Sequence, residues 1–189
     1  MADLVRRPGA GLRRVRQQDR GPLVEYLAFA LAGEPYAAPV TLVREILKPP
    51  PLTPVPRAPR SVLGIVSVRG QLVTVIDLRR RLRLAEAQPT RRARILLVDG
   101  QGGETLGLFV DEVLAVYRLA DGEVEAAAAA LGNEVAPYIA GIARPGAARM
   151  AIAAPLGAGE AAKRRATMAS APAEEGGVVI LLDLRAVLA

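Results

Sequence analysis

The chain has 189 residues, of which 51% are hydrophobic, so it is long enough and apolar enough to bury a substantial core. It contains no cysteine and no histidine, which excludes disulfides and thiolate metal sites and removes the commonest general base. We therefore expect a globular protein that is not an enzyme and uses no cofactor or metal. The formal net charge of +6 is compatible with nucleic-acid binding, which is therefore a candidate function.

Residues 1–22 are expected to form a disordered basic extension. Between Met1 and Arg20, six arginines against two aspartates supply four of the six net positive charges. The stretch is rich in Gly and Gln and shows no hydrophobic period, a pattern typical of disorder. It is interpreted as a solubilising extension, with a polybasic arm for an acidic surface as the alternative.

The sequence carries no sign of a membrane span or a secretory signal. No uncharged apolar run approaches the roughly 18 to 20 residues that cross a bilayer. No apolar segment of a signal peptide follows the N-terminal arginines. We therefore expect a cytoplasmic protein without direct membrane insertion.

The first part of the folded region predicts a β-hairpin followed by a short helix. Apolar and β-branched residues predict strands at Leu23–Leu31 and 36–40, joined by a turn at 33–35. In residues 41–47 the apolar positions recur every three or four residues, which predicts two helical turns. Six prolines between positions 49 and 59 then predict an extended connector.

The centre of the chain predicts a second hairpin. Residues 63–68 and 72–78 are rich in β-branched and aliphatic side chains, and Arg69 and Gly70 lie where a tight turn is needed. The arginines of residues 79–83 are interpreted as a solvated strand end or short helix, and residues 85–92 as a polar linker.

The second half of the chain predicts a similar series of elements. Strands are predicted at 94–98 and Thr105–Val110, and the apolar run continues over 113–117. A short helical turn at 126–131 and a strand at 138–142 follow. The last strand begins at residue 178.

Several of these pieces occur twice. Ile76-Asp77-Leu78-Arg79 returns as Leu182-Asp183-Leu184-Arg185, and Gly64 has a counterpart in Gly141. We therefore predict an all-β fold of two similar small barrels related by internal duplication, with subdomains at 23–90 and 91–189. The second copy is longer, and its extra residues, about 145–176, are expected to form a flexible insertion between two strands that pair with each other.

An enzyme and a nucleic-acid-binding protein are the alternatives to a protein that works by presenting binding surfaces. Asp77 and Asp183 are equivalent carboxylates, but each lies at a strand end beside Leu-Arg, where capping and turn hydrogen bonds are the usual role. Small β-barrels bind single-stranded nucleic acid, but such sites need aromatic stacking platforms, and the chain is only 3% aromatic. A basic nucleic-acid-binding barrel is kept as the alternative function, although no nucleic-acid partner is expected.

Residues 64–79 resemble the signature of the CheW family of bacterial chemotaxis coupling proteins. In that signature Gly and two hydrophobic residues precede Asn-Leu-Arg-Gly, and Pro with two hydrophobic residues precedes Asp-Leu-Arg. Residues 33–37 and 43–46 also fit the family pattern. Ser67 replaces the usual Asn, Thr74 replaces the usual Pro, and Pro39 stands where many members carry an acidic residue.

The resemblance implies two five-stranded, SH3-like barrels packed around a hydrophobic interface, over residues 23–189. It implies a scaffold that couples chemoreceptors, the methyl-accepting chemotaxis proteins, to a CheA-type histidine kinase in signal transduction. The implied partners are the cytoplasmic hairpin tip of the receptor and the regulatory domain of the kinase. An adaptor of a non-flagellar chemosensory pathway, such as surface motility, is a further alternative within the same fold.

The resemblance also implies which residues bind partners: Val43, Glu45, Ile46, Leu47, Gly64, Ser67, Val68 and Arg69. Glu45, Ile46 and Leu47 lie near the family's kinase contacts, and the others with Glu45 near its receptor groove. For Val43 and Val68, plain core packing is an equal alternative. For Arg69 the alternative is a simple hairpin turn, but no turn type requires an arginine.

Overall fold

The computed structural model describes residues 22–132, 135–144, 150–151 and 177–189. The basic extension, apart from Pro22, and the insertion at about 145–176, apart from residues 150 and 151, lie outside the described residues. The described part consists of two β-sheets and several short helices, so the all-β prediction is confirmed.

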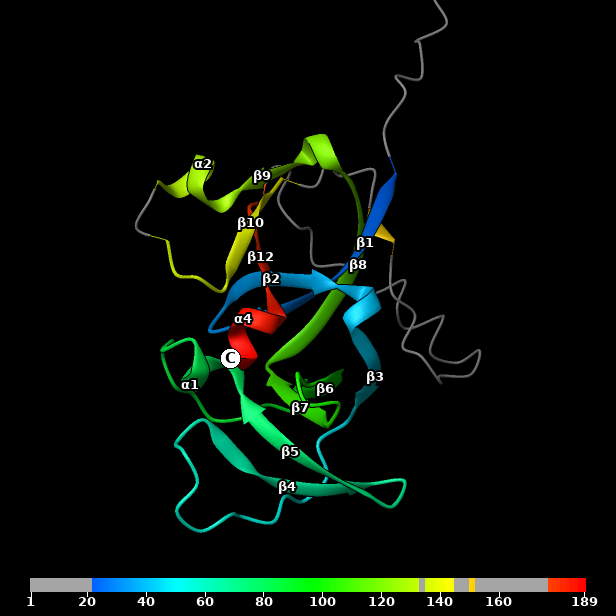
Figure 1. Cartoon of the computed structure of the whole chain (residues 1–189), viewed down its shortest axis with the longest axis vertical. Coiled ribbons are helices and arrows are strands. Elements are labelled where there is room, and N and C mark those ends of the chain that lie inside the picture. Colours follow the sequence, from blue (N-terminus) through cyan, green and yellow to red (C-terminus); the bar gives the residue numbers. More distant parts are fainter. Residues whose placement is uncertain (1–21, 133–134, 145–149, 152–176) are drawn as a thin grey trace, which may run out of the picture.

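The five-stranded sheet occupies the lower half of the molecule in Figure 1. Its strand order is β3-β6-β7-β5-β4, which makes β3 and β4 its two edges. The strands are β3 (Val43–Leu47), β4 (Val62–Val68), β5 (Gln71–Asp77), β6 (Arg94–Asp99) and β7 (Thr105–Val110). The short helix α1 (Leu78–Arg81) follows β5 directly.

The seven-stranded sheet forms the other half, with the order β11-β8-β1-β2-β12-β10-β9. Its strands are β1 (Leu23–Leu31), β2 (Glu34–Pro39), β8 (Glu112–Ala120), β9 (Val124–Ala126), β10 (Ile139–Ala143), β11 (Met150–Ala151) and β12 (Val179–Leu182). The helical pieces are η1 (Val40–Leu42), η2 (Asp121–Glu123), α2 (Ala127–Leu131) and α4 (Leu184–Leu188). The pairing of β10 with β12 confirms that the strands flanking the insertion are partners.

The internal duplication is visible in the strand order. The series β8-β1-β2-β12-β10 repeats β3-β6-β7-β5-β4, and each contains one parallel pair, β2 with β12 and β7 with β5. The hairpin β1–β2 of the first copy lies among strands of the second copy, and the hairpin β6–β7 of the second copy lies among strands of the first. Each sheet therefore takes strands from both sides of position 90, where the sequence predicts a subdomain boundary.

Three hydrophobic clusters hold these layers together. One lies between the two sheets and includes Phe29, Leu78, Leu96 and Val187, one lies against the seven-stranded sheet, and one lies against the five-stranded sheet. The two faces of β6 serve different clusters, because Leu96 and Val98 face the other sheet while Ile95 and Leu97 face the interior of their own. Each buried side chain of this size contributes about 1.5–3 kcal/mol of transfer free energy.

The helix expected at residues 41–47 is wrong. The chain instead forms η1 and then β3, which pairs antiparallel with β6. Val40, Val43 and Ile46 all pack against the cluster between the sheets, at intervals of three residues. A 3-10 turn repeats every three residues, and a bulge between Val43 and Glu45 carries the same spacing into the strand. The apolar residues of this segment therefore recur at nearly helical spacing, although the segment forms no α-helix.

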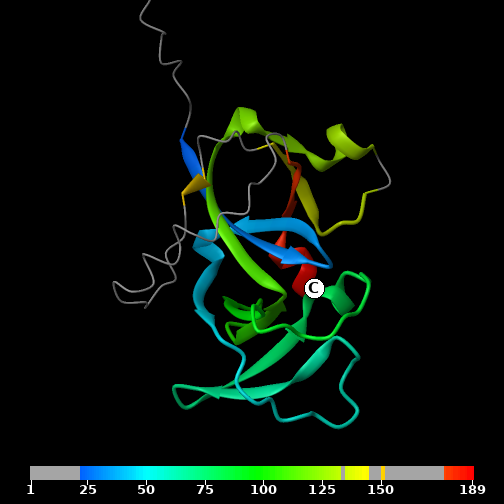
Figure 2. The ribbon, with the colours of Figure 1, turned by 180° about the vertical axis from the view of Figure 1, so that it is seen from behind.

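Two equivalent aspartates begin the short helices α1 and α4. The carboxylate of Asp77 accepts hydrogen bonds from the backbone N–H groups of Arg79 and Arg80, and that of Asp183 does the same for Arg185 and Ala186. The predicted structural role of both aspartates as capping residues is therefore confirmed. Figures 1 and 2 show α4 between the two sheets, with the β4–β5 hairpin at the far end.

Candidate partner-binding surface

The residues that the sequence singles out lie on the two edges of the five-stranded sheet. Val43, Glu45, Ile46 and Leu47 belong to β3, whereas Gly64, Ser67 and Val68 belong to β4, and Arg69 begins the turn after β4. In the sheet order these edges are four strands apart, but curvature brings their ends together. Nη2 of Arg69 lies 3.0 Å from Oε1 of Glu45.

The Glu45–Arg69 ion pair lies at the surface. The Arg69 side chain is 79% exposed and that of Glu45 is 32% exposed. Exposed pairs of this kind contribute about 0–1 kcal/mol to folding, because water screens them and two long side chains lose freedom. The pair therefore orients a guanidinium and a carboxylate at the surface more than it stabilises the sheet.

Arg69 also has a backbone conformation that arginine does not favour. Its φ is +50° and that of Gly70 is +83°, and Val68 pairs with Gln71 across the two-residue loop. Turns with two positive φ values prefer Asn or Asp followed by Gly. A left-handed non-glycine residue costs roughly 1–2 kcal/mol. Turn stability alone does not account for an arginine at this position.

The apolar members of the set have packing roles. Val43 and Ile46 are partly buried against the cluster between the sheets, and Leu47 and Val68 are partly buried against the interior cluster of the five-stranded sheet. Ser67 is exposed. The structure thus brings Glu45 and Arg69 together at the surface, while the apolar residues line the layers beneath them.

Gly64 is buried and accommodates a neighbouring segment of its own chain. Its φ is +151°, and a Cβ there would lie 2.5 Å from the carbonyl oxygen of Thr53 in the proline-rich connector. Thr53 exchanges two hydrogen bonds of 2.9 Å with Ile65. Gly141 has the equivalent place in the other sheet, where a Cβ would lie 2.6 Å from the carbonyl oxygen of Glu125. The close approach at Gly64 is therefore intramolecular.

Leu72 is a surface residue outside the set of partner-binding residues predicted from the sequence. It faces Ser67 across the β4–β5 hairpin and is 74% exposed, the most of any large hydrophobic side chain in the described ranges. Its neighbours Val73 and Val75 are buried. Successive side chains of a strand point to opposite faces of the sheet. Because Leu72 precedes the buried Val73, the sequence of β5 could have predicted that Leu72 faces solvent.

Residues 25–189 match the model of a family described as the CheW-like domain. The chain belongs to this family. It is 32% identical to the chemotaxis protein CheW of Rhizobium meliloti over 53% of this chain and 64% of that protein, slightly under two thirds of its length. It is 27% identical to the chemotaxis protein CheW of Helicobacter pylori over 66% of this chain and 75% of that protein.

The fold is also that of a solved CheW structure. The scaffolding protein TtCheW of Thermoanaerobacter tengcongensis superposes with a TM-score of 0.64, covering 87% of this chain and 92% of that one, at 22% sequence identity. The prediction of a CheW-like fold is therefore confirmed.

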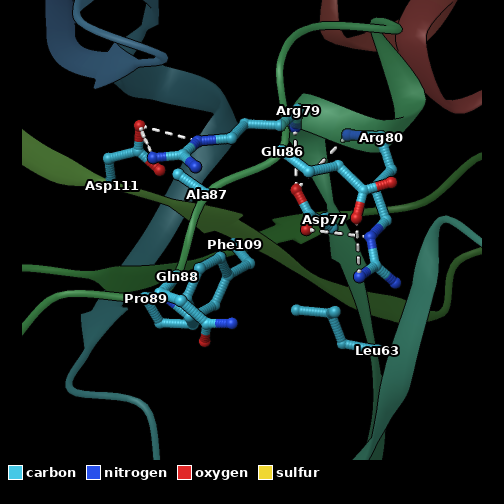
Figure 3. Close-up of a pocket in the computed structure, with 10 residues that line it drawn as sticks. All are labelled: Leu63, Asp77, Arg79, Arg80, Glu86, Ala87, Gln88, Pro89, Phe109 and Asp111. Atoms are coloured by element: carbon cyan, nitrogen blue, oxygen red, sulfur yellow. Dashed lines mark hydrogen bonds and ion pairs between the residues drawn. The ribbon is translucent and has the colours of Figure 1, made fainter.

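The CheW-like domain has a pocket beside α1, which Figure 3 shows. It encloses about 350 Å³ and has an apolar wall formed by Leu63, Phe109 and Pro89. Its charged groups are paired with one another: Arg79 with Asp111, and Arg80 with Asp77 and Glu86. The pocket therefore holds two arginines and three carboxylates, all of them joined in ion pairs.

Three tyrosines among the described residues have a raised pKa. Burial raises the pKa of Tyr26, Tyr36 and Tyr117, with smaller contributions from Asp121 at Tyr26 and from Glu34 and Tyr138 at Tyr36. These hydroxyls stay protonated at neutral pH. In the same residues, no acidic groups gather in threes as candidate metal ligands, and no helix is long and apolar enough to cross a membrane.

Proposed function

We propose that this CheW-like protein is a scaffold that couples chemoreceptors to a CheA-type histidine kinase. The observation that carries the proposal is the family match over residues 25–189, which includes both sheets. Such a scaffold binds two partners at once and performs no chemistry of its own. It works in the cytoplasm, at the membrane-distal tips of the receptors.

The receptor-facing surface in this proposal is centred on Glu45 and Arg69. Their ion pair holds a carboxylate and a guanidinium at the meeting point of two sheet edges, where a helical hairpin with polar and apolar faces finds oriented charges beside partly buried aliphatic groups. The unfavourable backbone conformation of Arg69 supports a role in binding, since a strained residue that folding does not require points to function.

The tip of the β4–β5 hairpin supplies a second contact. Leu72 exposes an isolated aliphatic side chain there, and interface anchors are commonly apolar groups that a partner can cover fully. We assign Leu72 to the contact with one of the two partners. Ile46 and Leu47, which the family resemblance also implicates, lie on β3 at the opposite edge of the sheet and are partly buried there.

Binding assays with separate partners test the proposal. The purified protein is titrated with a receptor hairpin tip, with the kinase regulatory domain, and with both together. A scaffold binds each partner saturably and forms a ternary complex. Binding of neither partner by a folded protein contradicts the proposal. A receptor from a flagellar or a non-flagellar pathway that is captured selectively identifies the pathway.

The nucleic-acid alternative predicts a different dependence on salt. Affinity carried by phosphate contacts falls steeply between about 50 and 200 mM salt, whereas a mixed apolar and polar protein interface responds much less. The same titrations with single-stranded DNA and RNA provide the comparison. Tight, salt-sensitive binding to nucleic acid, without binding to the receptor tip, would favour the alternative.

A further inference from the structure

Asp111 occupies the point where the chain passes from one sheet to the other. It is the single residue between β7, which ends at Val110 in the five-stranded sheet, and β8, which begins at Glu112 in the seven-stranded sheet. Figure 2 shows the long β8 reaching down toward β6 and β7 at this point. A connection of one residue restricts how far the ends of β7 and β8 can move relative to each other.

The side chain of Asp111 contacts both halves of the molecule. Its Oδ2 accepts a hydrogen bond of 2.8 Å from the backbone N–H of Ala32, in the β1–β2 turn, and one of 2.8 Å from Nε of Arg79, in α1. Nη2 of Arg79 lies 2.5 Å from the same oxygen. The backbone N–H of Asp111 donates to the carbonyl of Ala30. Figure 3 shows the pair of side chains at the edge of the pocket.

This pair is largely shielded from water, unlike the pair formed by Glu45 and Arg69. The side chains of Arg79 and Asp111 are 11% and 15% exposed. Asp111 also borders two open hollows, one beside α1 and one beside the β1–β2 turn. Charge-assisted hydrogen bonds are strong and directional in such surroundings. The pair therefore connects α1 directly to the β1–β2 turn.

Among the described residues, the related position in the other half of the duplicated fold has no such ion pair. Val75 pairs with Gly107 as Leu181 pairs with Ala37, so the register equates Arg79 with Arg185 and Asp111 with Thr41. Thr41 is exposed and carries no charge. Within the described ranges, the ionic connection thus occurs at one of the two related positions.

We propose that Asp111 is a positioning residue that fixes the orientation of the two sheets through Arg79 and Ala32, and that this orientation sets the affinity for partners. The second part rests on the proposed function. Val43 of β3 packs against the same cluster between the sheets as Val113 and Val116 of β8. A change in the angle between the sheets therefore alters the packing beneath β3, the strand that carries Glu45 and one side of the candidate surface.

A distance measurement on the isolated protein tests the first part. Because the chain has no cysteine, Gln71→Cys on the five-stranded sheet and Ala128→Cys on α2 are unique sites for spin labels. The distance distribution between them is compared for the parent, Asp111→Asn, Arg79→Gln and Arg79→Lys. Asn keeps an acceptor for the Ala32 N–H but removes the charge, and Lys keeps the charge but not the paired N–H geometry.

The expected result is a broader or shifted distribution for Asp111→Asn and Arg79→Gln, with partial recovery in Arg79→Lys. Arg92→Gln is the matched control, since Arg92 pairs with the adjacent Glu112 but is 76% exposed. It should leave the distribution unchanged. Identical distributions in all folded variants would overturn the proposal, and Arg79→Gln keeps the test available if Asp111→Asn does not fold.

Partner titrations test the second part. The apparent affinity falls in proportion to the fraction of molecules that keep the binding orientation, so a tenfold loss of that fraction gives about tenfold weaker binding. Altered distributions with unchanged affinity would overturn the link to binding. If the parent binds neither partner while the distributions still respond to Asp111→Asn, the proposed function has failed and the positioning role stands.

Discussion

Arg69 and Glu45 form an ion pair across the two edges of one sheet, although 24 positions separate them in the sequence. Nη2 of Arg69 lies 3.0 Å from Oε1 of Glu45, and the arginine is held in a left-handed conformation at a hairpin turn. The contact depends on the curvature of the sheet, because β3 and β4 are not neighbours in the strand order.

Replacing Arg69 with asparagine should separate folding from binding. Asparagine is favoured at this turn position, and the exposed ion pair contributes at most about 1 kcal/mol, so we expect Arg69→Asn to change the free energy of unfolding by less than about 1 kcal/mol. Receptor binding should weaken about tenfold, as for the loss of an interface hot spot. Urea denaturation and titration with the receptor tip measure the two quantities.

Arg69→Ala and Glu45→Gln complete a double-mutant cycle for this pair. Arg69→Ala should also weaken receptor binding while the protein stays folded. If the pair acts as a unit at the interface, the double variant binds only as weakly as either single variant. Normal receptor binding by Arg69→Ala, or early melting of that variant, would contradict the proposed role.

Gly64→Ala should destabilise the protein through a backbone clash. The added Cβ would lie 2.5 Å from the Thr53 carbonyl oxygen at a φ of +151°, so the free energy of unfolding should fall by roughly 1–3 kcal/mol. Gly122→Ala is the control, because nothing lies within 4 Å of its added Cβ, and its effect should stay within about 0.5 kcal/mol. Equal stability of the two variants by urea denaturation would refute this explanation of Gly64.

Leu72→Ser should weaken partner binding without a loss of stability. The side chain is 74% exposed, so its removal costs little packing, and the free energy of unfolding should change by less than about 0.5 kcal/mol. Binding to one of the two partners should weaken about tenfold. Leu23→Ser, at an exposed position of β1, is the matched control and should bind both partners normally. Unchanged binding of both partners by Leu72→Ser would exclude a contact there.

Stability should decline at alkaline pH. Burial raises the pKa of Tyr26, Tyr36 and Tyr117 above the unfolded value of about 10. The folded state then retains protons that the unfolded state releases, so this contribution is present below pH 10 and is lost as pH rises through the folded pKa values. Each tyrosine contributes a slope of at most about 1.4 kcal/mol per pH unit.

Denaturation curves at several pH values between 7 and 11 check this expectation. The absence of histidine and cysteine predicts little change between about pH 6 and 8 from side chains that normally titrate there. Tyr117→Phe removes one ionising hydroxyl, and its stability should depend less steeply on pH above 10. The same slope in the parent and in Tyr117→Phe would show that this tyrosine is not responsible.

Local patterns in the sequence predicted much of the fold. Alternating apolar residues and an Arg-Gly pair identified the β4–β5 hairpin, and the repeated Asp-Leu-Arg identified the duplication and two helix caps. These features depend on residues close together in the chain, which is why they could be read directly. The helix predicted at residues 41–47 was wrong because a 3-10 turn and a bulged strand place apolar side chains at nearly the spacing of a helix.

The sequence by itself determined the β-rich composition, the repeat, the hairpins and the family signature, since each is encoded by neighbouring residues. Only the tertiary structure decided which hairpin joined which sheet. It also decided three contacts between distant residues: the ion pair of Glu45 with Arg69, the close approach of the Thr53 carbonyl to Gly64, and the link that Asp111 makes between Arg79 and the β1–β2 turn. The two copies have similar edges and similar apolar faces, so local preference does not distinguish pairing within a copy from exchange between copies. The exchange of hairpins is instead favoured by the burial of the shared cluster between the sheets, to which both copies contribute apolar side chains.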